Sequence, residues 1–136
     1  MGCRNEWADD THLIMDFYIE APWTWVEFIG HAEQVFSIIK AHGKPCATTV
    51  DVSRIGTMPK GNVLRYLTEI DSQMPENVFA SVVIGAPYMV SVFMEIIMRM
   101  RPRAQRIALL AKTHEEAYEK ILERYAKLKV SAEKSA

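Results

Sequence analysis

Cysteine is scarce in this chain of 136 residues, which contains only two. Cys3 and Cys46 are too few for the disulfide framework of a small secreted domain. Cys46 begins a strand-like segment, which indicates a small buried side chain rather than an activated thiol. A chain of this length buries roughly 70% of its unfolded surface, so its stability requires neither disulfides nor a structural metal. The sequence therefore predicts one self-sufficient domain.

The chain also lacks an excess of charge of either sign. Sixteen Lys and Arg residues against seventeen Asp and Glu residues give a formal net charge of −1. This balance provides no global field for a polyanion, so we expect no nucleic-acid partner. The basic residues are unevenly distributed, however, because four arginines fall within eight positions: Arg99, Arg101, Arg103 and Arg106.

A long uninterrupted hydrophobic run is missing as well. Residues 1–15 contain no continuous apolar stretch of the kind found in signal peptides. The longest apolar-rich segment, 78–98, is broken by five residues: Ser81, Gly85, Pro87, Ser91 and Glu95. It is typical of two elements of a globular domain rather than of a membrane span. We therefore expect no integral membrane segment and a cytoplasmic location.

Motifs for catalysis and cofactor binding are absent. The sequence has no dinucleotide-binding glycine fingerprint, no phosphate-binding loop and no nucleophile elbow. Its four histidines fall on different predicted elements without the spacing of metal ligands. We therefore expect no catalytic residue, no metal and no cofactor, and predict that the protein is not an enzyme. An enzyme would require Asp51 to meet a second ionisable group in a cleft.

What the sequence does contain is a regular alternation of strand and helix patterns. Strand patterns cover residues 12–20, 46–52, 78–84 and 106–111, and residues 3–7 supply a partner for an N-terminal hairpin. Helix patterns with capping residues occupy the intervals and the end of the chain. The predicted fold class is α/β, a mainly parallel sheet of about five strands with an N-terminal hairpin and four helices. Residues 1–128 form the domain, and residues 129–136 a frayed polar tail.

One candidate site is the segment 51–62, which follows the predicted strand 46–52. The carboxyl ends of parallel strands border the binding crevice of an open sheet. The polar and glycine residues expected to bind a ligand or partner there are Asp51, Ser53, Thr57, Lys60 and Gly61. The alternative is local: Asp51 and Ser53 satisfy turn amides, and Thr57 caps the next helix.

The second candidate is the helix pattern 88–101, which contains four of the eight methionines. Its apolar residues cover nearly the whole circumference, whereas a helix packed on one sheet face needs only a stripe. The surplus face predicts an interface or a contact with an apolar ligand through Met89, Phe93, Met94, Ile97 and Met100, with Arg99 and Arg101 at the rim. The alternative is a helix buried between the sheet and its neighbours.

Four segments in this order resemble the STAS domain, the fold of SpoIIAA-type anti-sigma factor antagonists, and in particular its divergent SpoIIAA-like branch. They are TWVEF, CATTVDVSRIGTMPKGNVL, VVIGAPYMVSVFMEII and RIALLAKTHEEAYEKI, which together span roughly residues 11–125. The resemblance implies a binding role rather than an active site. Some SpoIIAA-like proteins are also compared with the CRAL-TRIO lipid-exchange fold, which implies a lipid contact for the methionine-rich helix.

In STAS antagonists, an Asp-Ser-Ser-Gly type motif carries a serine that a partner kinase phosphorylates. Asp51 and Ser53 match the strand end, and Gly61 matches the motif glycine. Pro59 and Lys60 stand where the phosphorylated serine is expected, and Thr57 is the nearby hydroxyl. This departure argues against a phosphorylation switch.

The leading hypothesis is a non-enzymatic STAS-like regulatory or protein-interaction module, which associates through helix 88–101 as a homodimer or with a regulatory protein partner. The alternative is a small carrier or sensor of an apolar or anionic, lipid-like ligand. That alternative requires an enclosed cavity between this helix and the sheet, with Arg99 or Arg101 at its mouth.

Overall fold

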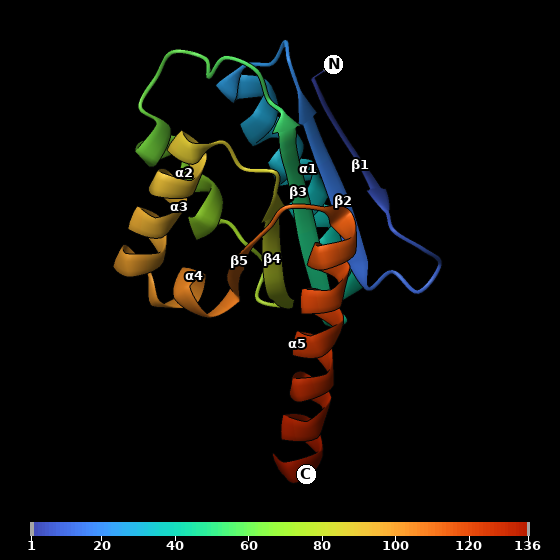
Figure 1. Ribbon diagram of the computed structural model, residues 1–136. Coiled ribbons are helices and arrows are strands. Elements are labelled where there is room, and N and C mark those ends of the chain that lie inside the picture. Colours follow the sequence, from blue (N-terminus) through green and yellow to red (C-terminus); the bar gives the residue numbers. More distant parts are fainter. Residues whose placement is uncertain (1, 136) are drawn as a thin grey trace.

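Strands and helices alternate along residues 2–135, the part of the chain that this computed structural model describes (Figure 1). Their order and bounds are β1 (Cys3–Trp7), β2 (Ile14–Glu20), α1 (Trp25–His42), β3 (Cys46–Arg54), α2 (Val63–Ser72), β4 (Val78–Ile84), α3 (Tyr88–Met100), α4 (Pro102–Ile107), β5 (Ala108–Ala111) and α5 (His114–Ser135). The α/β class predicted from the sequence is confirmed. No helix within these residues has both the length and the apolarity needed to cross a bilayer.

The five strands form one mixed sheet in the order β1-β2-β3-β4-β5. The hairpin strands β1 and β2 pair antiparallel, whereas the other three neighbouring pairs are parallel. The expectation of a mainly parallel sheet is therefore corrected to a mixed one. The reason is the short β1–β2 connection, which can join only antiparallel neighbours, while each parallel pair is joined through a helix.

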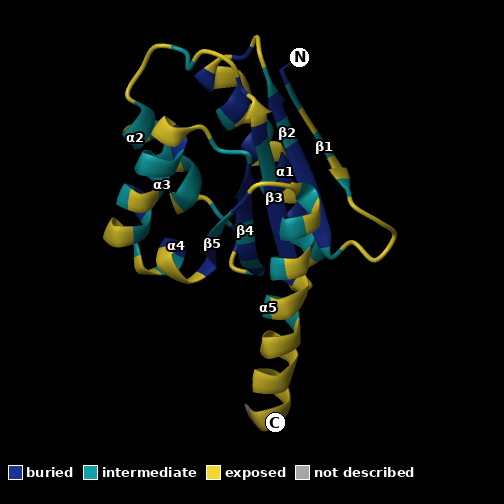
Figure 2. Ribbon diagram, viewed as in Figure 1, coloured by how far each residue is buried: buried dark blue, intermediate teal, exposed yellow. Residues whose placement is uncertain are grey.

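The helices are divided unequally between the two faces of the sheet. The parallel strands β2 to β5 follow one another across the sheet in sequence order. Right-handed connections between strands in this order place all the connecting helices on the same face of the sheet. Helices α1 to α4 accordingly pack on the face that carries Met15 and Phe17, and α5 packs alone on the opposite face against Ala80 and Val82 (Figure 1). The strands between these layers are largely buried (Figure 2).

The helix boundaries follow local capping signals. The Thr24 side chain accepts a hydrogen bond from the Glu27 amide at 3.1 Å, and Gly43 ends α1 with φ of 74°. At the start of α5 the Thr113 hydroxyl accepts from the Glu116 amide at 3.1 Å. These ends were predicted correctly because a cap depends only on residues a few positions apart.

Three strand boundaries differ from the prediction: β2 begins at Ile14 rather than at residue 12, β3 ends at Arg54 rather than at residue 52, and β5 begins at Ala108 rather than at residue 106. Residues 106 and 107 belong to α4 rather than to the last strand, which begins at Ala108, so there are five helices instead of four. Pro102 ends α3 as expected, but it also occupies the first turn of α4, where its missing amide hydrogen costs nothing. Helix α5 continues to Ser135 and so includes residues 129–135 of the predicted polar tail, where Lys129 lies over the Tyr125 ring at 4.5 Å; residue 136 lies outside the described residues.

Candidate functional site

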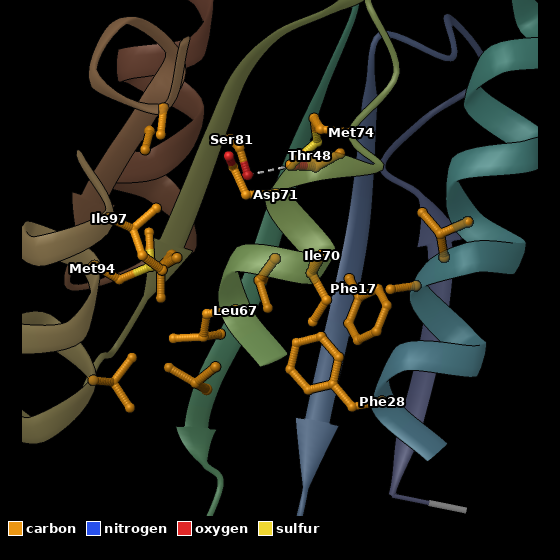
Figure 3. A pocket seen from close by; sticks show the side chains of 18 of the residues that line it. Phe17, Phe28, Thr48, Leu67, Ile70, Asp71, Met74, Ser81, Met94 and Ile97 are labelled. Carbon is orange, nitrogen blue, oxygen red and sulfur yellow. Dashed lines mark hydrogen bonds between the residues drawn. The ribbon is translucent and has the colours of Figure 1, made fainter. Parts of the chain in front are cut away.

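An apolar cavity of about 120 Å³ lies between the sheet and helices α1, α2 and α3 (Figure 3). Its walls are mostly aliphatic and aromatic side chains from strands and helices; those labelled in Figure 3 are Phe17, Phe28, Thr48, Leu67, Ile70, Asp71, Met74, Ser81, Met94 and Ile97. A dry cavity of about 150 Å³ lined by such residues binds benzene or xenon. The cavity of about 120 Å³ is slightly smaller than this, so its volume limits an occupant to a small apolar molecule.

Helix α2 explains why the space is not filled. It has no buried residue, whereas α1 buries five side chains. The α2 side chains that line the cavity, such as Leu67 and Ile70, are only half-buried. The helix contacts α1 and α3, and its half-buried side chains pack against the core that these helices share with the strands.

Both ends of α2 are held by polar contacts. Before the helix, the Trp25 indole donates to the carbonyl of Pro59 at 3.1 Å, and the Trp25 ring stacks on Tyr66. After the last turn, Arg103 donates to the carbonyls of Met74 and Pro75. The apolar middle of α2 thus spans the cavity between two fixed ends.

A further contact joins α2 to the end of α3. The Nε atom of Arg101 lies 2.6 Å from the Asp71 carboxylate, which lines the cavity. Arg101 therefore lies at the rim of the cavity, as the carrier hypothesis requires, but its charge is already paired. Arg99 is exposed.

The other predicted residues of α3 fall into two groups. Met94 and Ile97 line the cavity, and Ile97 is buried. Met89 and Met100 lie on the surface with exposed fractions of 57% and 63%. Phe93 is half-buried outside the cavity lining. The apolar side chains of this helix therefore line the cavity on one side, while Met89 and Met100 contact solvent.

The predicted residues of segment 51–62 are also separated by the structure. Asp51 and Ser53 belong to β3, which continues to Arg54, while Thr57 and Lys60 are exposed in the connection to α2. Gly61 lies next to Tyr66 with φ of 142°, a backbone conformation that favours glycine. The cap of α2 is Asn62, which accepts from the Arg65 amide at 3.1 Å, and not Thr57.

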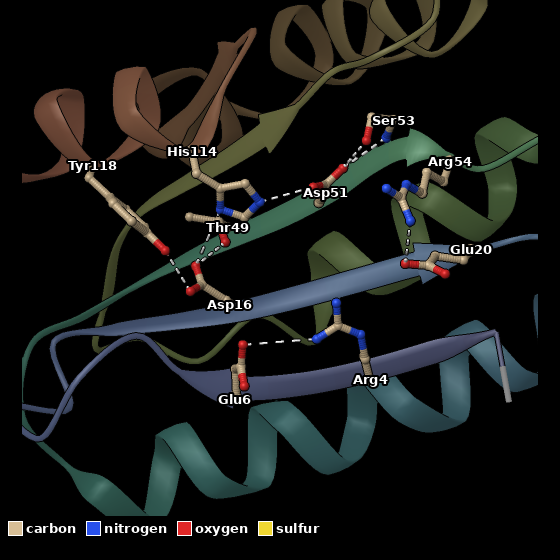
Figure 4. Close-up of polar contacts among 10 residues, drawn as sticks. All are labelled: Arg4, Glu6, Asp16, Glu20, Thr49, Asp51, Ser53, Arg54, His114 and Tyr118. Atoms are coloured by element: carbon tan, nitrogen blue, oxygen red, sulfur yellow. Dashed lines mark hydrogen bonds and ion pairs between the residues drawn. The ribbon is translucent and has the colours of Figure 1, made fainter.

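A cluster of polar side chains that the sequence analysis missed lies on the opposite face of the sheet (Figure 4). Asp16 is 3% exposed and accepts hydrogen bonds from the hydroxyls of Thr49 and Tyr118, each at 2.6 Å. His114 lies between two carboxylates, with Nε2 at 2.9 Å from Asp51 and Nδ1 at 4.0 Å from Asp16. The cluster therefore joins β2, β3 and α5.

These contacts change the ionisation of two members of the cluster. Burial raises the pKa of Asp51, but hydrogen bonds from the Ser53 hydroxyl and amide and from His114 outweigh it, so the pKa is lower than usual. Burial, followed by the hydrogen bond to Asp16, raises the pKa of Tyr118. Both shifts favour the observed arrangement, in which tyrosine donates and aspartate accepts.

Asp51 thus meets a second ionisable group, as an enzyme would require, and within the described cluster no hydroxyl is hydrogen-bonded to His114. The Ser53 hydroxyl donates to Asp51 at 2.6 Å rather than to His114. Both ring nitrogens of His114 face carboxylates. A polar pocket of about 220 Å³ adjoins the cluster, and Arg4, Tyr18 and Arg54 contribute to its walls.

The cysteines and the metal-ligating residue types form no further site. Cys46 is fully buried, and burial raises the pKa of its thiol to about 11, so it stays protonated at neutral pH. Within residues 2–135, no three His, Cys, Asp or Glu side chains are arranged to hold a metal ion.

Comparison with known proteins gives no relative: no family model, no curated protein and no solved structure matches the chain significantly. The resemblance to the STAS domain therefore rests on the four sequence segments and their order.

Proposed function

We propose that this protein is a non-enzymatic, STAS-like binding module that carries or senses a small apolar ligand. The observation that supports this proposal is the cavity of about 120 Å³ between the sheet and helices α1, α2 and α3. Its position between the methionine-rich helix and the sheet supports the carrier hypothesis, although the cavity is partly open rather than enclosed. Arg101 and Asp71 form the ion pair at its rim.

The physical reason for binding is the missing packing around the cavity. Side chains that border a void lose dispersion contacts, and a ligand of matching size restores these contacts. The transfer of the apolar ligand from water into the cavity is also favourable. A ligand that binds only the folded state raises the stability of the protein in proportion to the logarithm of its concentration. Occupation of the cavity is therefore measurable as a shift in the unfolding temperature.

The experiment uses benzene as the probe and compares two variants on α2. Leu67 lines the cavity, whereas Leu64, on the same helix, does not. We expect saturating benzene to raise the unfolding temperature of the wild type and of Leu64→Trp by several degrees. Leu67→Trp fills the space and should lose this response. Equal responses of the two variants, or no response of the wild type, would contradict the proposal.

Native mass spectrometry after mild purification provides an independent test. A small apolar molecule that is retained by the wild type and lost from Leu67→Trp would support the ligand-binding function. A spectrum that shows only the mass of the protein, together with no change in unfolding temperature on addition of benzene, would count against the ligand-binding function.

A second candidate function, self-association through α3, is favoured by a different observation. Tyr88, Met89 and Met100 are 80%, 57% and 63% exposed on this one helix. Large apolar side chains grouped on a surface are typical of interfaces. Sedimentation of the wild type should then show a dimer. The substitution Met89→Glu should dissociate this dimer, whereas the control Glu33→Gln, at an exposed position of α1, should not. A strict monomer at high concentration would exclude this function.

A further inference from the structure

We propose, on the basis of the ligand-binding function above, that the ligand is an uncharged ring compound of about the size of phenol. Its single hydrogen-bonding oxygen is held by the hydroxyl pair of Thr48 and Ser81. Three properties of the cavity support this inference: its volume, the charge of its lining and one unused hydrogen-bond donor.

The volume limits the ligand to a small molecule. A cavity of about 120 Å³ is slightly smaller than the cavities of about 150 Å³ that bind benzene. An acyl chain of a membrane lipid would require α2 to move away from the sheet. Aromatic and aliphatic walls on opposite sides, including Phe17, Phe28 and Ile97, suit a flat ring.

The charge of the lining argues against an anionic ligand. Asp71 is the one ionisable side chain among the described residues that line the cavity, and Arg101 pairs with it at 2.6 Å. A ligand carboxylate would meet a second carboxylate in apolar surroundings and no unpaired cation. Desolvation of such an unpaired charge is strongly unfavourable. A cationic ligand would have to displace Arg101 from Asp71.

The donor comes from two neighbouring strands. Thr48 on β3 and Ser81 on β4 are partners in the parallel register, and both line the cavity. Their hydroxyl oxygens are 2.9 Å apart and share one hydrogen bond (Figure 3). Whichever hydroxyl donates, the other keeps a hydrogen that has no acceptor among the described residues. Thr48 is 4% exposed and Ser81 is half-buried, so a phenol, ether or ketone oxygen inside the cavity would give this donor an acceptor in place of water.

The test compares benzene, phenol and benzoate, which share one ring, by calorimetric titration of the wild type and of the double variant Thr48→Val/Ser81→Ala. The wild type should bind phenol at least as tightly as benzene and should not bind benzoate. In the double variant the affinity for phenol relative to that for benzene should fall about tenfold, whatever the change in the affinity for benzene. Retained benzene binding shows that the variant is folded.

The outcomes separate this inference from the function on which it rests. Two outcomes would overturn the inference alone, provided that the wild type binds benzene. In the first, the wild type binds phenol tenfold more weakly than benzene; in the second, the double variant keeps the phenol affinity of the wild type relative to that for benzene. Benzoate binding more tightly than phenol would also overturn it. Failure of all three probes to bind the wild type would overturn both proposals. The ranking of the three probes on the wild type needs no variant.

Discussion

On one face of the sheet an apolar cavity lies beneath helices α1, α2 and α3, whereas on the other face α5 covers a hydrogen-bonded cluster of polar side chains (Figures 3 and 4). Hydrophobic contacts have no preferred direction, so a helix such as α2 can be held above the sheet without filling the space beneath it. Buried hydrogen bonds require defined distances and angles, so the α5 face has little freedom. One face is thus suited to adapt to a ligand and the other to hold the fold in place.

The largest effect is expected from the buried carboxylate of the polar face. Asp16→Ala would leave the buried Thr49 hydroxyl and the half-buried Tyr118 hydroxyl without their acceptor. We expect a loss of about 3–5 kcal/mol in the free energy of unfolding, measured with denaturant. Asp16→Asn keeps one carbonyl acceptor and should lose less. A loss below about 1 kcal/mol for the alanine variant would show that the cluster is not a structural anchor.

The same truncation on the two faces compares their packing directly. Ile121 of α5 is 0% exposed in a filled layer, whereas Ile97 of α3 is 3% exposed and borders the cavity. Ile121→Ala should cost about 4 kcal/mol and Ile97→Ala about 2 kcal/mol, because Ile97 has fewer neighbouring atoms to lose. Chemical denaturation of both variants measures the difference. Equal costs would mean that the two faces are packed equally well.

The pH dependence of stability should report on Asp51. The pKa of this carboxyl in the folded protein is lower than its ordinary value of 3.8, because hydrogen bonds from Ser53 and His114 outweigh the effect of burial. Its contribution is therefore fully present above pH 3.8 and is lost as the pH falls through the lower folded-state value.

The variant Asp51→Asn does not titrate at this position and should be about 1 kcal/mol less stable than the wild type at pH 6. This difference should shrink steadily as the pH is lowered from 4 to 2. Parallel denaturation curves across this range measure it. A difference that stays constant with pH would mean that Asp51 acts through its shape and not through its charge.

The smallest effect concerns the closure of the cavity. Arg101→Ala removes the ion pair with Asp71 and should cost about 0.5 kcal/mol globally. The same change should increase hydrogen exchange of the α2 amides several-fold, because α2 buries no side chain of its own. Arg99→Ala, an exposed arginine two residues earlier, is the matched control and should leave exchange in α2 unchanged. Faster exchange throughout the sheet instead would indicate general destabilisation.

Much of the fold could be predicted because its signals are local. Thr24, Glu27 and Gly43 fix the ends of α1 within a few residues, and the apolar run 78–84 identifies a strand covered on both faces. The boundary at Arg106 was wrong because Arg106 and Ile107, which end α4, run directly into the apolar strand with no glycine or proline between them to mark the end of the helix. The candidate sites were harder, since the polar cluster joins residues up to 102 positions apart, as in Asp16 and Tyr118.

The sequence by itself determined the alternation of strands and helices, the helix caps and the surplus of apolar side chains on residues 88–101, because each depends on spacing along the chain. Only the tertiary structure decided that Met94 and Ile97 face a cavity while Met89 and Met100 face solvent. It also decided that His114 meets Asp16 and Asp51. The volume left beneath a helix and the meeting of distant side chains depend on how whole elements sit on the sheet, and no local pattern encodes that placement.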